Sequence, residues 1–305
     1  MIVSILLVQA LILATADDVL QLKPCQTTIH TQDSPTADSL FQLNQSSRPI
    51  ETPLGIGFGI ECSWQRYCFL STAFDCQSAW RSISPSTVER AWVLRHRGAP
   101  EEAYALPFMM MGLSARCYFQ LNLKPGKEMS YITLSELRDA AEALADTCAS
   151  GQQIAQGGIA RSPGGDNNLD LVMTEYQPRA QCNGPGTFPQ DMQSSCGRIL
   201  ESMPVSRQQT IFGPQGDPAA EETTPSQIRT RNFECVIEIT SGGKIDEVSW
   251  YQLWQESNAI FALCVRKGQS GYSQGLGERS RFHLSIFSGD KGLAGNSSLT
   301  ARFIA

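Results

Sequence analysis

The chain has 305 residues, enough for two domains of ordinary size, and it is acidic, with a formal net charge of −6. Its lysines and arginines are scattered, and the densest basic stretch, residues 95–97, has no series of aromatic partners, so nucleic-acid binding is not expected. The three histidines (His30, His96 and His283) lie far apart, and none is at metal-ligand spacing from a cysteine pair, so we expect no metal site.

Residues 1–16 are predicted to be a secretory signal peptide. The run Ile2–Ala14 is apolar apart from Ser4 and Gln9, it ends in Ala-Thr-Ala, and two aspartates follow at once. The alternative is a membrane anchor, but the run is shorter than the roughly twenty residues that a spanning helix needs. No later segment is long and apolar enough to span a membrane, so we expect a secreted, extracellular protein without a transmembrane segment.

Polar segments flank the patterned part of the chain. Residues 17–53 are rich in Ser, Thr, Gln, Asp and Pro and are predicted to be a loose leader, and residues 288–305 a flexible tail. Each carries a glycosylation sequon, at Asn44 and Asn296, where a surface glycan would fit.

The region between them contains one unit twice. In the first copy a strand begins at Cys117, Thr133-Leu-Ser-Glu136 forms a capping box, a helical stripe ends at Cys148, and a strand at 169–173 follows a glycine-rich loop. The second copy has Cys235, the capping box Ser249-Trp-Tyr-Gln252, Cys264 and a strand at 282–286. The helical parts align without a gap for seventeen residues, Ile132–Cys148 against Val248–Cys264.

The repeat extends upstream, because Cys62 and Cys76 have the same spacing as Cys182 and Cys196. We therefore predict two tandem four-cysteine modules, residues 54–176 and 177–287, each with a strand–helix–strand unit. In an exported chain, ten cysteines, an even number, indicate five disulfides.

Element lengths suggest a disulfide pattern. A strand of seven residues spans about 23 Å and a helix of fifteen about 22 Å, so a helix that returns along its strand brings the two ends together. The predicted pairs are Cys117–Cys148, Cys235–Cys264, Cys62–Cys76, Cys182–Cys196 and, by elimination, Cys25–Cys68. The alternative joins the helix that carries Cys76 to the one that ends at Cys148.

The sequence contains one match to a catalytic motif. Gly271-Tyr-Ser-Gln-Gly275 resembles the nucleophile elbow of secreted fungal cutinases, with Ser273 as nucleophile. An elbow needs a strand before it and a helix after it, whereas here the helix precedes, and His283 and Asp290 follow in the wrong order and too close. We therefore expect a glycine loop and no catalytic residue. The glycine loops also lack the lysine of a phosphate-binding loop, and no cofactor is expected.

Two apolar features are predicted to be core. Trp250 and Trp254 could stack on a sugar, but both lie on the apolar face of their helix. The run Phe108–Met111 is interpreted as a buried, gap-filling segment in preference to a binding surface.

The order cysteine–strand–capping box–helix–cysteine–glycine loop–strand resembles cysteine-rich secreted fungal proteins, the killer-toxin-like and necrosis-inducing-factor-like effectors. The residues that match are Cys76, Cys117, Thr133, Glu136, Cys148, Gly157 and Gly158, and then Cys196, Cys235, Ser249, Gln252, Cys264, Gly275 and Gly277. The resemblance implies an α+β fold of two α/β-sandwich modules, each with an antiparallel or mixed sheet and a parallel strand pair joined by a right-handed crossover.

The resemblance also implies action by binding an extracellular target (a protein, a glycan or a membrane component) rather than by catalysis. The alternatives are a secreted serine esterase that uses Ser273, and a small-molecule binder or cyclase of a secretory-pathway biosynthesis. A roomy apolar pocket between the modules would favour the last of these.

Overall fold

The computed structural model describes residues 58–66, 72–95, 103–149, 156–164, 166–183, 190–230, 234–289 and 300–303, all of which belong to one compact unit, Ser34–Ala305. The predicted signal peptide and leader, both sequons, Cys25 and Cys68 lie outside the described residues.

The first module runs from β1 to β8. Its elements are β1 (Gly59–Arg66), α2 (Thr72–Arg81), β2 (Glu89–Leu94), β3 (Tyr104–Leu106), β4 (Phe108–Met111), β5 (Cys117–Leu123), β6 (Met129–Thr133), α3 (Leu134–Cys148), β7 (Gln156–Arg161) and β8 (Leu169–Glu175).

The second module runs from β9 to β17. Its elements are β9 (Gln181–Asn183), α4 (Gln190–Ser202), β10 (Gln209–Pro214), β11 (Glu222–Thr224), β12 (Ser226–Arg229), β13 (Val236–Thr240), β14 (Asp246–Ser249), α5 (Trp250–Leu263), the short 3-10 helix η1 (Val265–Lys267), β15 (Ser270–Leu276), β16 (Phe282–Phe287) and β17 (Thr300–Phe303).

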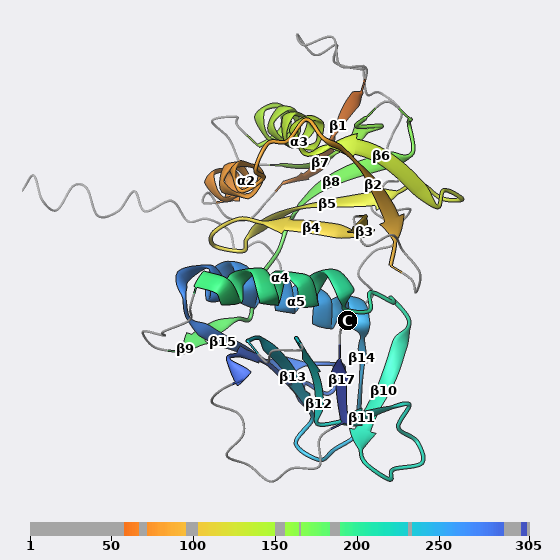
Figure 1. Ribbon diagram of the computed structural model, residues 1–305, viewed down its shortest axis with the longest axis vertical. Coiled ribbons are helices and arrows are strands. Elements are labelled where there is room, and N and C mark those ends of the chain that lie inside the picture. Colours follow the sequence, from red (N-terminus) through yellow and green to blue (C-terminus); the bar gives the residue numbers. More distant parts are fainter. Residues whose placement is uncertain are drawn as a thin grey trace, which may run out of the picture. The chain divides into compact units, whose positions relative to one another are not determined.

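The two modules share one topology. The large sheets have the orders β1-β7-β8-β5-β4 and β9-β15-β16-β13-β12, and β17 is added beyond β12. The small sheets are β3-β2-β6 and β11-β10-β14. Helices α2 and α3 lie against one face of the first large sheet, and α5 covers the same face of the second (Figure 1). The predicted α+β fold with two tandem modules is confirmed.

Both capping boxes form as predicted. The Glu136 amide donates to Thr133 Oγ1 over 3.0 Å, and the Thr133 amide donates to the Glu136 carboxylate over 2.9 Å. Ser249 and Gln252 make the same reciprocal pair over 3.1 and 3.2 Å. These bonds satisfy amides that a helix start leaves without partners, which is why α3 and α5 begin where they do.

The predicted glycine loops are wrong in part, because each contains a strand. Gly158 lies in β7 and Gly271 in β15, and both strands pair inside the large sheets. A Cβ at Gly158 would come within 2.9 Å of Cys148 Sγ, and one at Gly271 within 2.8 Å of Cys264 Sγ. Glycine is required here because a helix and its disulfide pass directly over the strand.

The predicted parallel pair within the strand–helix–strand unit is also wrong. In the first module β5 pairs antiparallel with β8, and in the second β13 pairs antiparallel with β16. The extra strand in each glycine segment reverses the chain before the closing strand. The parallel neighbours among the described strands are β2 with β3, β10 with β11, and β12 with β17.

The four described disulfides differ from both predicted patterns. They are Cys62–Cys148, Cys76–Cys117, Cys182–Cys264 and Cys196–Cys235. The prediction assumed that the helix turns back directly along its strand, but β6 and β14 intervene and belong to the small sheets. The end of α3 therefore lies over β7 and β1, where Cys62 pairs with Gly158, and Cys148 meets Cys62. Pairing stays within each module and follows one pattern in both.

The prediction that residues 288–305 form a flexible tail is wrong near the end of the chain. Residues 300–303 form β17, which pairs in parallel with β12.

Candidate functional site

Ser273 lies at the centre of β15 and is not exposed. Tyr272 stacks on His283, with ring centroids 5.4 Å apart, and consecutive strand residues point to opposite faces, so Ser273 points away from His283. The Ser273 Oγ is buried without a hydrogen-bond partner in the described structure. The structure therefore does not bring this serine and histidine together, and Asp290 lies outside the described residues.

Other site classes are also not observed in the part of the chain that the structure describes. The described cysteines are all in disulfides, and no group of three His, Cys, Asp or Glu side chains there could hold a metal ion. Among these same residues, no helix combines the length and apolarity that crossing a bilayer requires.

A partly open cavity of about 260 Å³ lies between β4 of the first module and helices α4 and α5 of the second. Most of its lining is apolar, and the polar members are two serines, an asparagine, two arginines and one glutamate. The lining consists of Ser82, Ile83, Ser84, Arg95, Tyr104, Phe108, Met109, Met110, Met111, Leu134, Gly197, Leu200, Glu201, Trp254, Asn258, Phe261, Ala262 and Arg266.

Strand β4 forms one wall because it is apolar on both faces. Phe108 and Met110 pack into the core of the first module, whereas Met109 and Met111 join the core of the second. The methionines are only 7, 4 and 2% exposed, so the predicted burial of this run is confirmed for them, whereas Phe108 is partly buried. The run also lines the cavity.

Arg95 joins the modules at one end of β4. Its Nη1 donates to the backbone oxygens of Leu200 and Met203 at the end of α4, and its Nη2 donates to Pro107 O over 2.9 Å. The guanidinium also lies 4.9 Å from the centre of the Trp254 ring. Burial lowers the pKa of Arg95 to about 10, and the nearby charge of Glu201 partly opposes this shift, so Arg95 is a cation at neutral pH.

Arg266 makes a similar junction at the other end. Its Nη1 donates to Met111 O over 3.0 Å, and its guanidinium lies 5.7 Å from the Phe261 ring centre. Burial lowers the pKa of Arg266, and the charge of Asp75 opposes the shift.

Buried polar side chains join β5 to α5, a helix that also lines the cavity. The Tyr251 hydroxyl donates to Gln120 Oε1 over 2.5 Å, and Gln255 Nε2 donates to the Tyr118 hydroxyl over 3.0 Å. Such paired polar groups fix the register of a contact because any other alignment leaves them unsatisfied. The cavity therefore has walls that are held in place.

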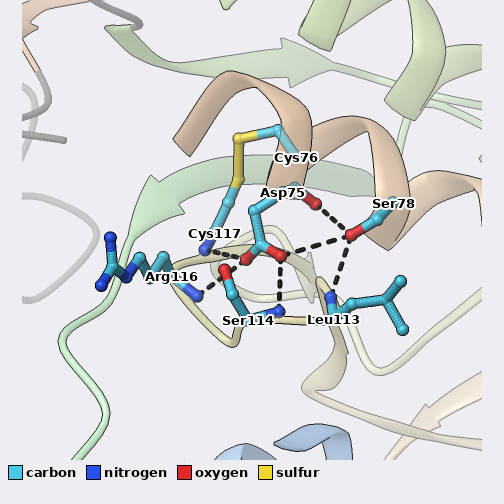
Figure 2. Close-up of a disulfide and its surroundings, with 7 residues drawn as sticks. All are labelled: Asp75, Cys76, Ser78, Leu113, Ser114, Arg116 and Cys117. Carbon is cyan, nitrogen blue, oxygen red and sulfur yellow. Dashed lines mark hydrogen bonds between the residues drawn. A yellow bond between two sulfur atoms is a disulfide. The ribbon is translucent and has the colours of Figure 1, made fainter. Parts of the chain in front are cut away.

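Asp75 holds the turn that follows β4. Figure 2 shows its carboxylate facing the backbone amides of Ser114, Arg116 and Cys117, which donate over 2.7, 2.8 and 2.9 Å. The Cys76–Cys117 disulfide joins the same two segments. Since Met111 ends β4 just before this turn, Asp75 helps to position one end of the cavity.

No family model, curated protein or solved structure matches the chain.

Sequence reasoning did not identify Arg95, Trp254 and Arg266 as site residues, although a signal was present. In the repeat alignment Trp254, which is buried, corresponds to Arg138, which is only partly buried. Positions that are apolar in one copy and polar in the other indicate a surface that is buried in only one of them.

Proposed function

We propose that the protein is a secreted, non-enzymatic binding protein, effector-like in pattern, and that it holds a small, largely apolar molecule in the cavity between its modules. The observation that carries the proposal is the cavity itself, which combines a methionine and aromatic lining with few polar groups. Ligand sites are typically concave, mostly apolar and supplied with a small number of placed polar side chains.

The lining suits a ligand of modest size. Methionine side chains are flexible and polarizable, so they adapt to an irregular apolar partner. Trp254 is 1% exposed and its Nε1 donates to Leu200 O over 3.0 Å, which keeps the ring in one orientation beside the cavity.

The esterase alternative has no supporting observation, since Ser273 is buried and turned away from His283. The cyclase alternative shares the cavity. Glu201 is the carboxyl group among the described lining residues, and no acid–base pair accompanies it there.

Gly197 offers a test that leaves the fold intact. It lies within α4 and lines the cavity, and a Cβ built on it meets no atom within 4 Å. We expect octan-1-ol to bind the wild-type protein saturably in calorimetric titration, and Gly197→Phe to remove this binding by filling the cavity.

Gly197→Ala is the matched control. It should keep binding and gain up to about 1 kcal/mol of stability, because alanine favours a helix interior over glycine. Absence of saturable octan-1-ol binding in the wild type, or equal binding by Gly197→Phe, would contradict the proposal.

A further inference from the structure

The cavity has a guanidinium at each end of β4. Arg95 is bound to Pro107 O, just before the strand, and Arg266 is bound to Met111 O, at its last residue. Four residue steps in a strand span about 13 Å. The site is therefore extended along β4, apolar in the middle and cationic at both ends.

The two arginines differ in the donors that they have left. Both Arg95 Nη atoms already donate to backbone carbonyl oxygens, and its Nε, which has no hydrogen-bond partner in the described structure, is buried. Arg266 is half-buried, and within the described chain the hydrogen bond of its guanidinium is the one from Nη1 to Met111 O. A guanidinium carries five N–H donors in a planar fork, so Arg266 keeps donors for a further acceptor.

The charge of the lining favours an anion at the Arg266 end. The lining has two arginines and one glutamate, although the whole chain has a net charge of −6. The negative charge of Glu201 interacts with Arg95, at the other end of β4. Asp75 acts on Arg266 and opposes an incoming anion, but its carboxylate is 2% exposed and already accepts three backbone amides. The open donors of Arg266 are therefore the strongest polar feature offered to a ligand.

We infer that the cavity binds an apolar carboxylic acid, with its carboxylate on Arg266 and its hydrocarbon part along β4 against the methionines and Trp254. This inference rests on the proposed function and adds the chemical class of the ligand. A guanidinium matches a carboxylate in geometry as well as in charge, and hydrogen bonds of this kind are about twice as strong as neutral ones.

The test compares octanoate with octan-1-ol, which has the same chain and a neutral head group. Calorimetric titration of the wild-type protein at neutral pH and low salt should give an affinity for octanoate about tenfold higher than for octan-1-ol, since hydrogen bonds to charged groups contribute this much or more. The advantage should shrink as salt is added, because screening weakens the ionic contact.

The variant Arg266→Gln should remove the tenfold preference, so that this variant binds octanoate and octan-1-ol with equal affinity. The matched control is Arg281→Gln. Arg281 also donates Nη1 to a backbone oxygen, Ile245 O at 2.9 Å, but it does not line the cavity, so the preference should persist.

The outcomes separate the two ideas. Equal affinity of the wild type for octanoate and octan-1-ol overturns the carboxylate inference and leaves the proposed function standing. If neither compound binds, the proposed function and the carboxylate inference are both overturned. The wild-type comparison needs no variant, so it decides the matter even if Arg266→Gln does not fold.

Discussion

Carboxylates hold equivalent loops of the two modules from opposite sides. At the turn after β4, the carboxylate is Asp75 on α2. The corresponding residue of α4 is Ser195, which is not exposed and donates its hydroxyl to Glu234, on the loop side. The acid and its partner have thus exchanged places between the copies.

The loop that packs on β14, and its counterpart beside β6, show the same exchange, but here the second module has the acid on the strand. Asp246 on β14 is 1% exposed and accepts the amides of Arg279 and Arg281 over 2.9 and 3.0 Å. In the first module the strand position is Ser130, whose hydroxyl donates to Asp166 of the loop over 2.8 Å. The requirement at both loops is therefore one acceptor-rich group between the loop and the helix or strand beside it, whichever segment supplies it.

Asp75→Asn should lower the free energy of unfolding by about 2–3 kcal/mol. The amide keeps one acceptor oxygen and directs an NH₂ group at backbone donors, and hydrogen bonds to charged groups contribute in this range. Urea unfolding with disulfides intact would measure the loss. Asp217→Asn is the control: Asp217 accepts one amide, from Ala219, at an exposed turn, and we expect less than about 0.5 kcal/mol there. Equal losses would contradict the role given to Asp75.

Tyr176 makes stability fall at alkaline pH. Burial raises its pKa well above the ordinary value, and the charge of Glu256, to which the hydroxyl donates, raises it further. The folded state keeps this proton above pH 10, where the unfolded state loses it. The contribution of Tyr176 to stability is therefore fully present below about pH 10. Above that pH its contribution to the free energy of unfolding declines by about 1.4 kcal/mol per pH unit.

Urea unfolding between pH 9 and pH 11 checks this slope. Tyr176→Phe removes the titrating hydroxyl and should reduce the slope by about 1.4 kcal/mol per pH unit. Tyr131→Phe, at a side chain that is 43% exposed, should leave it unchanged. A slope that is the same in all three proteins would refute the assignment.

At the scale of elements, helices α3 and α5 were predictable from sequence, whereas strands β7 and β15 were not. The capping boxes at Thr133 and Ser249 carry a local signal, and the chain obeys it. Strands β7 and β15 carry no apolar alternation at Gly158 and Gly271, because those positions face a disulfide instead of a side-chain layer. A pattern method interprets such glycines as loop.

The disulfides were mispredicted for a related reason. The cysteine spacing correctly indicated a repeat, but the pairing depends on which strand lies beneath the end of each helix. That strand is β1, more than eighty residues before Cys148 in sequence, and its neighbour β7 was not predicted. Long-range strand order leaves no mark in the local pattern. The cavity was hidden likewise, since it forms only when β4 meets α4 and α5.

At the scale of the whole molecule, the residues that join the two modules are not repeated on α3, the helix of the first module that corresponds to α5. The face of α5 toward β4 carries Tyr251 and Trp254, whereas α3 has Ser135 and Arg138 at the aligned positions. Repeat proteins need polar surfaces where stacking stops, and this exchange limits the stack to two modules.

The same contact should make the two modules unfold together. One buried cluster contains Met109, Met111 and Tyr118 of the first module with the core of the second. Tyr251 is 3% exposed, lies at this junction and donates to Gln120. We expect a single calorimetric transition for the wild type, because neither module can unfold without exposing apolar surface of the other.

Replacing Tyr251 with Ser, the residue that α3 has at the aligned position, should separate this transition into two. Truncating a buried aromatic side chain costs about 3–5 kcal/mol, and here much of the loss falls on the contact between modules. Tyr131→Ser, at an exposed site in the first module, is the matched control and should keep one transition near the wild-type temperature. If Tyr251→Ser instead shifts one undivided transition, the modules are coupled by contacts other than this junction.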